Sequence, residues 1–216
     1  MWVKVCGVTR LENALEVAGI RPNGIGLNFY KKSKRATDTA TAKRIVAALP
    51  PEILPVGLFV NHSTDDIRRI CDATGISTIQ LHGDEKPSMV VNLGGLRIIR
   101  AIRVDNETVG GLRDEISSWL DARADLFGIL LDARIDGTYG GTGHTAPWKL
   151  IADTYEREHW PPLILAGGLT PENVAAAIQD VTPWGIDVAS GVESSPGIKS
   201  PDLVRRFLTA TLDPQR

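Results

Sequence analysis

The sequence predicts one α/β domain, spanning residues 1–216 and folded as a closed (β/α)₈ barrel of the TIM type. Eight short apolar runs alternate with longer segments that carry helix signals. Several of these runs are continuously apolar, as expected for strands of a parallel sheet that is covered on both faces. The length lies near the short end of the roughly 200–250 residues usual for such a barrel. A doubly wound open sheet is the alternative, and the sequence lacks the GxGxxG turn that would favour it.

The expected strands follow one another along the whole chain. The first four cover residues 2–6, 24–29, 53–60 and 77–82. The last four cover residues 97–102, 126–132, 162–167 and 184–190. Each strand is expected to be followed by a helix.

Two helices of the first half carry signals at both ends. Residues 9–19 begin at a candidate cap, Thr9, have an acidic residue three positions later, and end at a glycine. Residues 63–75 repeat this pattern, with Ser63 or the threonine after it as the cap. Cys71 falls on the apolar face of the second helix, so we interpret it as a packing residue.

Two helices of the second half are expected to begin at a proline. Pro171 opens residues 170–180 and Pro201 opens residues 200–212, each directly after a threonine or serine. Proline is favoured at the first helical position, where its missing N–H is not needed.

Composition excludes several classes of function. The net charge of −2 and the single short basic cluster, residues 31–35, argue against a nucleic-acid partner. No signal peptide and no apolar run of membrane-spanning length occurs, so a cytoplasmic protein without a membrane partner is expected. The only two cysteines, Cys6 and Cys71, suggest neither a disulfide framework nor a metal site of paired thiolates.

Unusual residues gather where the strands of such a barrel end, which is where its active sites lie. Scattered loop polarity would not produce so consistent a placement. The residues concerned are Cys6, the stretch 28–35, His82, Asp132, and the glycine-containing turns after the last two strands.

The last two turns predict a phosphate-binding site. Gly167 and Gly168 would let backbone N–H groups approach a ligand, and the helix expected to open at Pro171 would add its positive end. Ser190 and Gly191 form a second small turn, in the pair of loops where barrels often hold phosphate. A small phosphorylated molecule is therefore the expected ligand.

Short motifs follow one another along the chain: KVCGVT (4–9), SKR (33–35), QLHG (80–83), LLD (130–132), GGTG (140–143), LAGGLTPENV (165–174) and GIDVASGVESSPGIKS (185–200). In this order they resemble the phosphoribosylanthranilate isomerases of tryptophan biosynthesis, over nearly the whole chain. The sequence departs from the usual pattern of that family at Asn28 and at residues 144–147, which could reshape the pocket wall.

The resemblance implies an Amadori rearrangement of N-(5-phosphoribosyl)anthranilate to the 1-deoxyribulose phosphate derivative. This chemistry needs an acid, a base and a phosphate anchor, but neither a metal nor a redox cofactor. A monomer or a homodimer is expected.

The resemblance also implies roles for three residues. Asp132 is the implied general acid, and its place after an apolar strand would raise a carboxyl pKa toward a useful range; the alternative is an aspartate that caps a turn. Cys6 is the implied base, and the alternative is a small buried hydrophobe. Arg35 is the implied clamp for the anthranilate carboxylate, because a guanidinium matches a carboxylate in a bidentate way; a solvated basic loop is the alternative.

Three further residues have two open interpretations each. Lys4 shares the inward face of the first strand with Cys6, so it would favour the thiolate or merely anchor a carboxylate inside the barrel. Asp187 would hold a sugar hydroxyl or serve as a buried structural carboxylate. His82 would form part of the pocket wall or be a core histidine with satisfied hydrogen bonds.

Three rival functions remain at this stage. The histidine-pathway isomerase performs the same rearrangement on a bis-phosphorylated substrate, but that family has an aspartate at the position of Cys6. A catalytically silent phosphate-binding barrel and a flavin-binding barrel are the other two.

Overall fold

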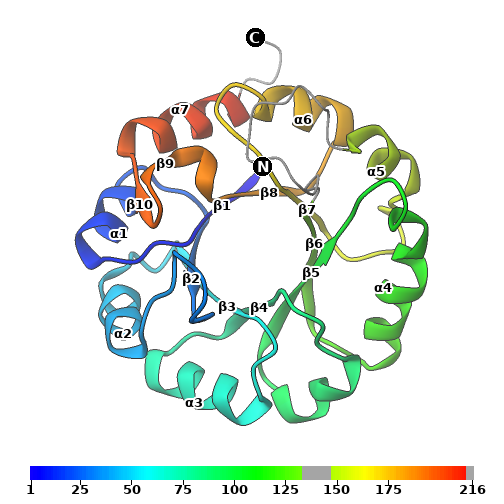
Figure 1. The fold of residues 1–216 in the computed structure, drawn as a ribbon, viewed down its shortest axis with the longest axis horizontal. Coiled ribbons are helices and arrows are strands. Elements are labelled where there is room, and N and C mark those ends of the chain that lie inside the picture. Colours follow the sequence, from blue (N-terminus) through cyan, green and yellow to red (C-terminus); the bar gives the residue numbers. More distant parts are fainter. Residues whose placement is uncertain (133–146, 213–216) are drawn as a thin grey trace.

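The computed structural model describes residues 1–132 and 147–212. Eight parallel strands form a closed barrel in the order β1 to β8, and helices surround it (Figure 1). The strands are β1 (Trp2–Cys6), β2 (Gly24–Asn28), β3 (Leu54–Phe59), β4 (Thr78–Leu81), β5 (Arg97–Arg103), β6 (Leu126–Asp132), β7 (Leu163–Ala166) and β8 (Gly185–Val188). All eight expected strands and the closed barrel are thereby confirmed, and the open sheet is excluded.

Helices follow the strands on the outside of the barrel. The α-helices are α1 (Leu11–Ala18), α2 (Thr39–Ala48), α3 (Thr64–Thr74), α4 (Leu112–Asp121), α5 (Trp148–Thr154), α6 (Val174–Val181) and α7 (Pro201–Leu212). Short 3₁₀ helices are η1 (Pro87–Leu93), η2 (Val109–Gly111) and η3 (Ser190–Val192). Within the described residues, no helix is both long and apolar enough to cross a membrane.

The signals of α3 act as predicted. The Ser63 hydroxyl accepts a hydrogen bond from the N–H of Asp66 and so satisfies a free donor of the first turn. Gly75 ends the helix with φ of 81°, a conformation that favours glycine. Cys71 is buried in this helix, which confirms it as a packing residue.

Three details of the helices differ from expectation. The cap position of α1 is Arg10 rather than Thr9, because the Thr9 hydroxyl donates instead to the carbonyl of Gly197. The helix after β7 begins at Val174, three residues beyond Pro171. The segment after β4 forms the 3₁₀ helix η1 instead of an α-helix.

An additional hairpin lies between β8 and α7. Strands β9 (Glu193–Ser195) and β10 (Ile198–Lys199) pair antiparallel, with Lys199 opposite Glu193. Figure 1 shows the hairpin beside β1 and α1, and Asn13 of α1 exchanges two hydrogen bonds with the backbone of Lys199. The sequence reasoning did not anticipate this element.

The apolar residues form two cores. The larger core fills the space between the strands and the surrounding helices. The smaller one lies inside the barrel and consists of Val56, Ile99, Ala101, Leu130, Ile164 and Ala166. Side chains alternate between the two faces of a strand. The residue two positions after a residue of this small core therefore also points into the barrel, closer to the carboxyl end of its strand.

Candidate active site

Charged and reactive side chains occupy the barrel interior beyond the small core. Lys4 and Cys6 share the inward face of β1, and Asp187 lies on the neighbouring strand β8. Asp132 is the last residue of β6, two positions beyond the core residue Leu130. The barrel thus brings together residues that lie up to 183 positions apart in the sequence, as the positions of Lys4 and Asp187 show.

Lys4 and Asp187 form a buried ion pair. The Nζ of Lys4 lies 2.9 Å from Oδ1 of Asp187, and the lysine side chain is 0 % exposed. Burial acts to lower the pKa of Lys4, but Asp187 and Cys6 outweigh it and raise the pKa above its ordinary value. The geometry therefore matches the reading in which Lys4 anchors a carboxylate inside the barrel.

Cys6 is buried beside this pair. Desolvation raises the pKa of the thiol, and the positive charges of Lys4 and Lys199 act in the opposite direction. The expected effect of Lys4 on the thiol is present, but burial outweighs it. The free protein accordingly favours the thiol over the thiolate.

Asp132 contacts His82 across the barrel mouth. The Nε2 of His82 lies 3.4 Å from Oδ2 of the aspartate, and the amide nitrogen of Gln80 lies 3.0 Å from Nδ1 of the same ring. An amide nitrogen only donates, so Nδ1 accepts and a neutral ring carries its proton on Nε2, toward Asp132. His82 also lines a cavity of about 310 Å³, but this cavity lies between the end of β5 and the start of α4 and is lined by neither Cys6 nor Asp132. The interpretation of His82 as part of the substrate pocket stays a prediction.

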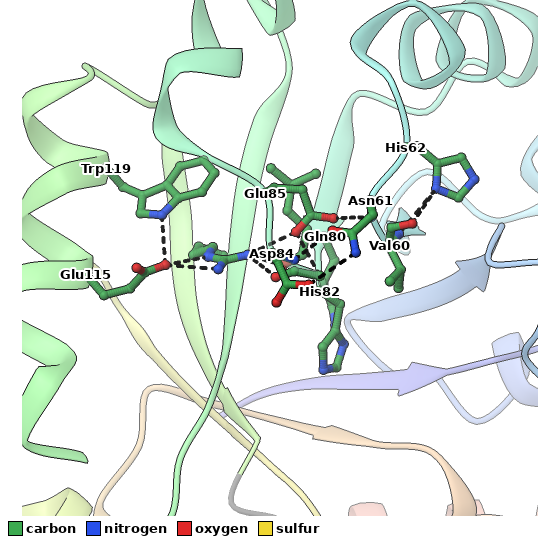
Figure 2. A network of polar contacts seen from close by, with 12 residues as sticks. Val60, Asn61, His62, Gln80, His82, Asp84, Glu85, Glu115 and Trp119 are labelled. Carbon is green, nitrogen blue, oxygen red and sulfur yellow. Dashed lines mark hydrogen bonds and ion pairs between the residues drawn. The ribbon is translucent and has the colours of Figure 1, made fainter. Parts of the chain in front are cut away.

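A buried network holds the chain on either side of His82 (Figure 2). The Glu85 carboxylate accepts hydrogen bonds from the backbone N–H groups of Asn61 and Gly83 at 2.8 and 2.7 Å. The guanidinium of Arg100 in β5 reaches the same carboxylate at 3.0 Å and binds Glu115 of α4 on its other side. The ends of β3 and β4 are thereby tied to β5, and the ring of His82 points away from this cluster in Figure 2.

Arg35 is bound by a carboxylate of the protein itself. Its Nε and Nη2 donate to the two oxygens of Glu193, both at 2.7 Å. The aliphatic part of the arginine lies on Gly7, where an added Cβ would stand 2.6 Å from its Cδ. Arg35 is therefore fixed against the turn that follows Cys6 and is not simply a solvated side chain.

The two glycine-containing turns come together as expected. Gly167 and Gly168 have φ of 96° and 63°, which side chains rarely adopt. Gly191 packs so closely on the other turn that a Cβ there would lie 1.9 Å from the carbonyl oxygen of Leu169. Ser190 and Gly191 open the 3₁₀ helix η3.

The helix end expected beside these turns lies further away. The N–H of Thr170 donates to the Asn173 side chain at 2.8 Å, and the Asn173 amide donates back to the Gly168 carbonyl at 3.0 Å. These bonds close a turn over residues 170–173, so α6 begins only at Val174. The helix therefore does not open at Pro171, contrary to expectation.

The departures from the family pattern fall in two places. Asn28 ends β2, and its side chain accepts from the N–H of Tyr30 and donates to the Ser33 hydroxyl. The residue thus shapes the loop that carries Arg35. Residues 144–146 lie outside the described residues, as does the GGTG stretch at 140–143.

Sequence reasoning missed five polar residues of this region. Gln80 and Arg100 could have been noticed as polar side chains inside otherwise apolar strands. Glu85 has no local signal. Glu193 and Lys199 lie within the motif at 185–200, to which no role for these two residues had been assigned.

Sequence comparison identifies close relatives of the whole chain. A family model described as N-(5'phosphoribosyl)anthranilate (PRA) isomerase matches residues 3–210. The N-(5'-phosphoribosyl)anthranilate isomerase of Rubrobacter xylanophilus is 42% identical over 210 residues, covering 96% of this chain and 97% of its own. The protein of the same name from Pseudomonas fluorescens is 43% identical over 208 residues, with 96% of each chain covered.

Solved structures that resemble this fold are isomerases of the same kind. The phosphoribosyl anthranilate isomerase of Thermotoga maritima superposes with a TM-score of 0.84 at 36% identity, and 96% of each chain is covered. Another isomerase of this kind, crystallised with reduced 1-(o-carboxyphenylamino)-1-deoxyribulose 5-phosphate, gives a TM-score of 0.80 at 34% identity, again over 96% of each chain.

Proposed function

The chain belongs to the N-(5'-phosphoribosyl)anthranilate isomerase family of tryptophan biosynthesis, and from this premise we propose how its residues carry out the aldose–ketose isomerisation. The substrate opens its furanose ring when the ring oxygen receives a proton, which leaves a Schiff base. Loss of the proton on C2′ then gives an enolamine. The enolamine tautomerises to the 1-deoxyribulose 5-phosphate derivative, so the reaction is balanced without any further reactant.

Asp132 is the proposed general acid. It is buried at the end of β6, where little water competes for the proton it would deliver to the ring oxygen. The Nε2–H of His82 faces its carboxylate, and a donor in this position stabilises the anion that remains after proton transfer.

Cys6 is the proposed base at C2′. It lies on β1, which β7 and β8 separate from β6 and Asp132 in the closed barrel, so a substrate in the mouth would lie between the two groups (Figure 1). The ammonium groups of Lys4 and Lys199 favour its thiolate. Asp187 keeps Lys4 charged in this position, and we assign it this role in preference to a direct contact with a sugar hydroxyl.

The phosphate and the carboxylate of the substrate would bind on either side of Cys6. We place the phosphate at Gly167, Gly168, Ser190 and Gly191, because the two glycine-containing turns meet there and no side chain of a glycine would keep a phosphate from their backbone N–H groups. We place the anthranilate carboxylate at Arg35, because a guanidinium can bind a carboxylate through two parallel hydrogen bonds.

The observation that carries the proposal is the meeting of Cys6, Asp132 and the two glycine turns at one end of the barrel. A fluorescence assay tests it: purified protein is expected to speed the loss of phosphoribosylanthranilate emission well above the spontaneous rate. Binding without turnover would instead indicate a silent phosphate-binding barrel. Faster turnover of the bis-phosphorylated substrate would indicate the histidine-pathway isomerase, and a visible spectrum would reveal a flavin.

No metal or redox cofactor takes part in the proposed mechanism. We also propose a cytoplasmic location and a monomeric or homodimeric state. One Thermotoga maritima structure of this kind, 34% identical with a TM-score of 0.78, is of monomers generated from a dimeric isomerase. Sedimentation equilibrium would determine which state this chain adopts.

A further inference from the structure

The β9–β10 hairpin carries a buried carboxylate between two cations. Glu193 accepts from Nε and Nη2 of Arg35, from Nζ of Lys199 at 2.7 Å, and from the N–H of Gly197 at 3.0 Å. The side chains of Glu193 and Lys199 are 6 % and 0 % exposed. Burial acts to raise the pKa of Glu193, but the bonds from Arg35 and Lys199 outweigh it and lower the pKa.

The hairpin is itself anchored to the elements around Cys6. Lys199 donates to the carbonyl of Ala189, which directly precedes the Ser190 turn. Its backbone exchanges two hydrogen bonds with Asn13 of α1, at 2.7 and 2.8 Å. The carbonyl of Gly197 accepts from Thr9, in the loop after Cys6. The position of Glu193 is thus determined by three different parts of the barrel mouth.

Glu193 determines how Arg35 is held. A carboxylate that accepts from Nε and Nη2 together fixes both the position and the plane of a guanidinium. It also separates the positive charge of Arg35 from that of Lys199, whose pKa burial and Arg35 both lower. Without the negative charge, two neighbouring cations would repel each other and Arg35 would lose its fixed orientation.

We propose that Glu193 is a positioning residue, which holds the Arg35 guanidinium in the orientation that receives the aryl carboxylate of the substrate. This inference rests on the proposed function. It predicts that removing the negative charge weakens recognition of the carboxylate far more than recognition of the phosphate.

The test compares Glu193→Gln with wild type and with Glu156→Gln. Glu156 is the control because its carboxylate also accepts from an arginine, Arg113, but the pair takes no part in the site. For each protein, KM, kcat and the melting temperature are measured. Inhibition constants are measured for the reduced product, which has the aryl carboxylate, and for ribose 5-phosphate, which lacks it.

In Glu193→Gln, KM and the inhibition constant of the reduced product are expected to rise roughly 10- to 100-fold. The inhibition constant of ribose 5-phosphate is expected to stay within about twofold of wild type, and Glu156→Gln is expected to change neither ligand's binding. Equal weakening of both ligands would overturn the proposal, because that is the effect of a general loss of structure. Unchanged or tighter binding of the reduced product would also overturn it and would make Glu193 a competitor for Arg35.

A second variant and a second measurement keep the result decisive. If Glu193→Gln does not fold, Glu193→Asp takes its place, since it keeps the charge but withdraws the carboxylate from Arg35; the same selective weakening is expected. If the wild-type protein turns over no phosphoribosylanthranilate, the proposed function fails. Calorimetric binding of the two inhibitors then still decides the role of Glu193, by the same selective or equal weakening.

Discussion

At the scale of single residues, two opposing effects act on the pKa of the Cys6 thiol. Burial raises the pKa of its thiol, while the ammonium groups of Lys4 and Lys199 act to lower it. A base must be ionised before it can accept a proton, so the activity of this group depends on which influence prevails at a given pH.

The pH dependence of alkylation at Cys6 follows from this balance. Because the pKa of Cys6 is raised in the free protein, the thiolate fraction increases with pH across the neutral and mildly alkaline range. Only the thiolate reacts with an alkylating reagent, so we expect the rate at which iodoacetamide modifies Cys6 to rise with pH over that range. Mass spectrometry of the modified protein measures this rate, and a rate that does not change with pH would contradict the expected ionisation of Cys6.

Removing the thiol is the complementary test. Cys6→Ala is expected to lower kcat at least roughly 10²–10⁴-fold, the usual contribution of one general base. Cys6→Ser is expected to remain very poor, because a hydroxyl is hardly ionised near neutral pH. The melting temperature is measured alongside kcat, and a stable alanine variant with near-normal kcat would show that Cys6 is only a packing residue.

Cys71 provides the matched control for these variants. It is buried in α3, and burial raises its pKa to about 12. Cys71→Ser is expected to reduce stability and to leave kcat near its wild-type value.

Asp132→Asn tests the proposed acid. Asparagine is nearly isosteric but has no proton to deliver to the ring oxygen, so turnover is expected to fall at least roughly 10²–10⁴-fold. Binding of ribose 5-phosphate and the melting temperature are expected to change little. Near-normal kcat in this variant would assign the proton transfer to another group.

At the scale of elements, local signals determined some boundaries and tertiary contacts determined others. Ser63 caps α3 as its sequence predicts, because its hydroxyl bonds within the same turn, to the N–H and the carboxylate of Asp66. Thr9 carries a similar signal, but its hydroxyl is used by Gly197, which lies 188 positions away in the chain. Pro171 permits a helix start, yet Asn173 closes a turn ahead of α6. A local pattern cannot reveal a distant or competing partner of this kind.

The turn after β7 gives a prediction at this scale. Gly168 has φ of 63°, and no atom lies within 4 Å of the position that a Cβ would take. A valine there would therefore strain the backbone and project into open space where phosphate oxygens would lie. In Gly168→Val we expect weaker inhibition by ribose 5-phosphate and a higher KM; unchanged values of both would place the phosphate elsewhere.

At the scale of the whole molecule, the barrel is closed by the pairing of its first and last strands. Lys4 of β1 lies opposite Asp187 of β8 in this pairing, and their ion pair crosses the seam inside the barrel. A buried charge that loses its partner is costly, whereas a buried pair replaced as a unit is often neutral or even stabilising.

Lys4→Met is therefore expected to lower the free energy of unfolding by about 3–5 kcal/mol, because it leaves Asp187 buried without its cation. Urea denaturation measures the change. The double variant Lys4→Met with Asp187→Leu is expected to recover much of the loss. If the single variant is as stable as wild type, the ion pair does not contribute to closing the barrel.

The barrel and its eight strands could be predicted because continuous apolar runs are a property of the strands themselves. The positions of Cys6, His82 and Asp132 at the strand ends followed from the same pattern. The Glu193–Arg35 and Glu85–Arg100 pairs could not be predicted, since each joins residues from different β/α units. The positions of charged residues in the sequence do not reveal which of them will form ion pairs in the folded protein.

The seam between β1 and β8 also affects how this chain can fold during its synthesis. About 180 residues separate the end of β1 from the end of β8, so the ribosome needs roughly 10–35 s to deliver the partner of the first strand. Throughout that interval the outer edge of β1 has hydrogen-bonding groups that no strand covers, and Asn13 lacks the backbone of Lys199. The nascent barrel is thus an open sheet in which the edge of β1 can pair with another strand. The arrival of β8 and the β9–β10 hairpin covers that edge and completes the barrel mouth around Cys6.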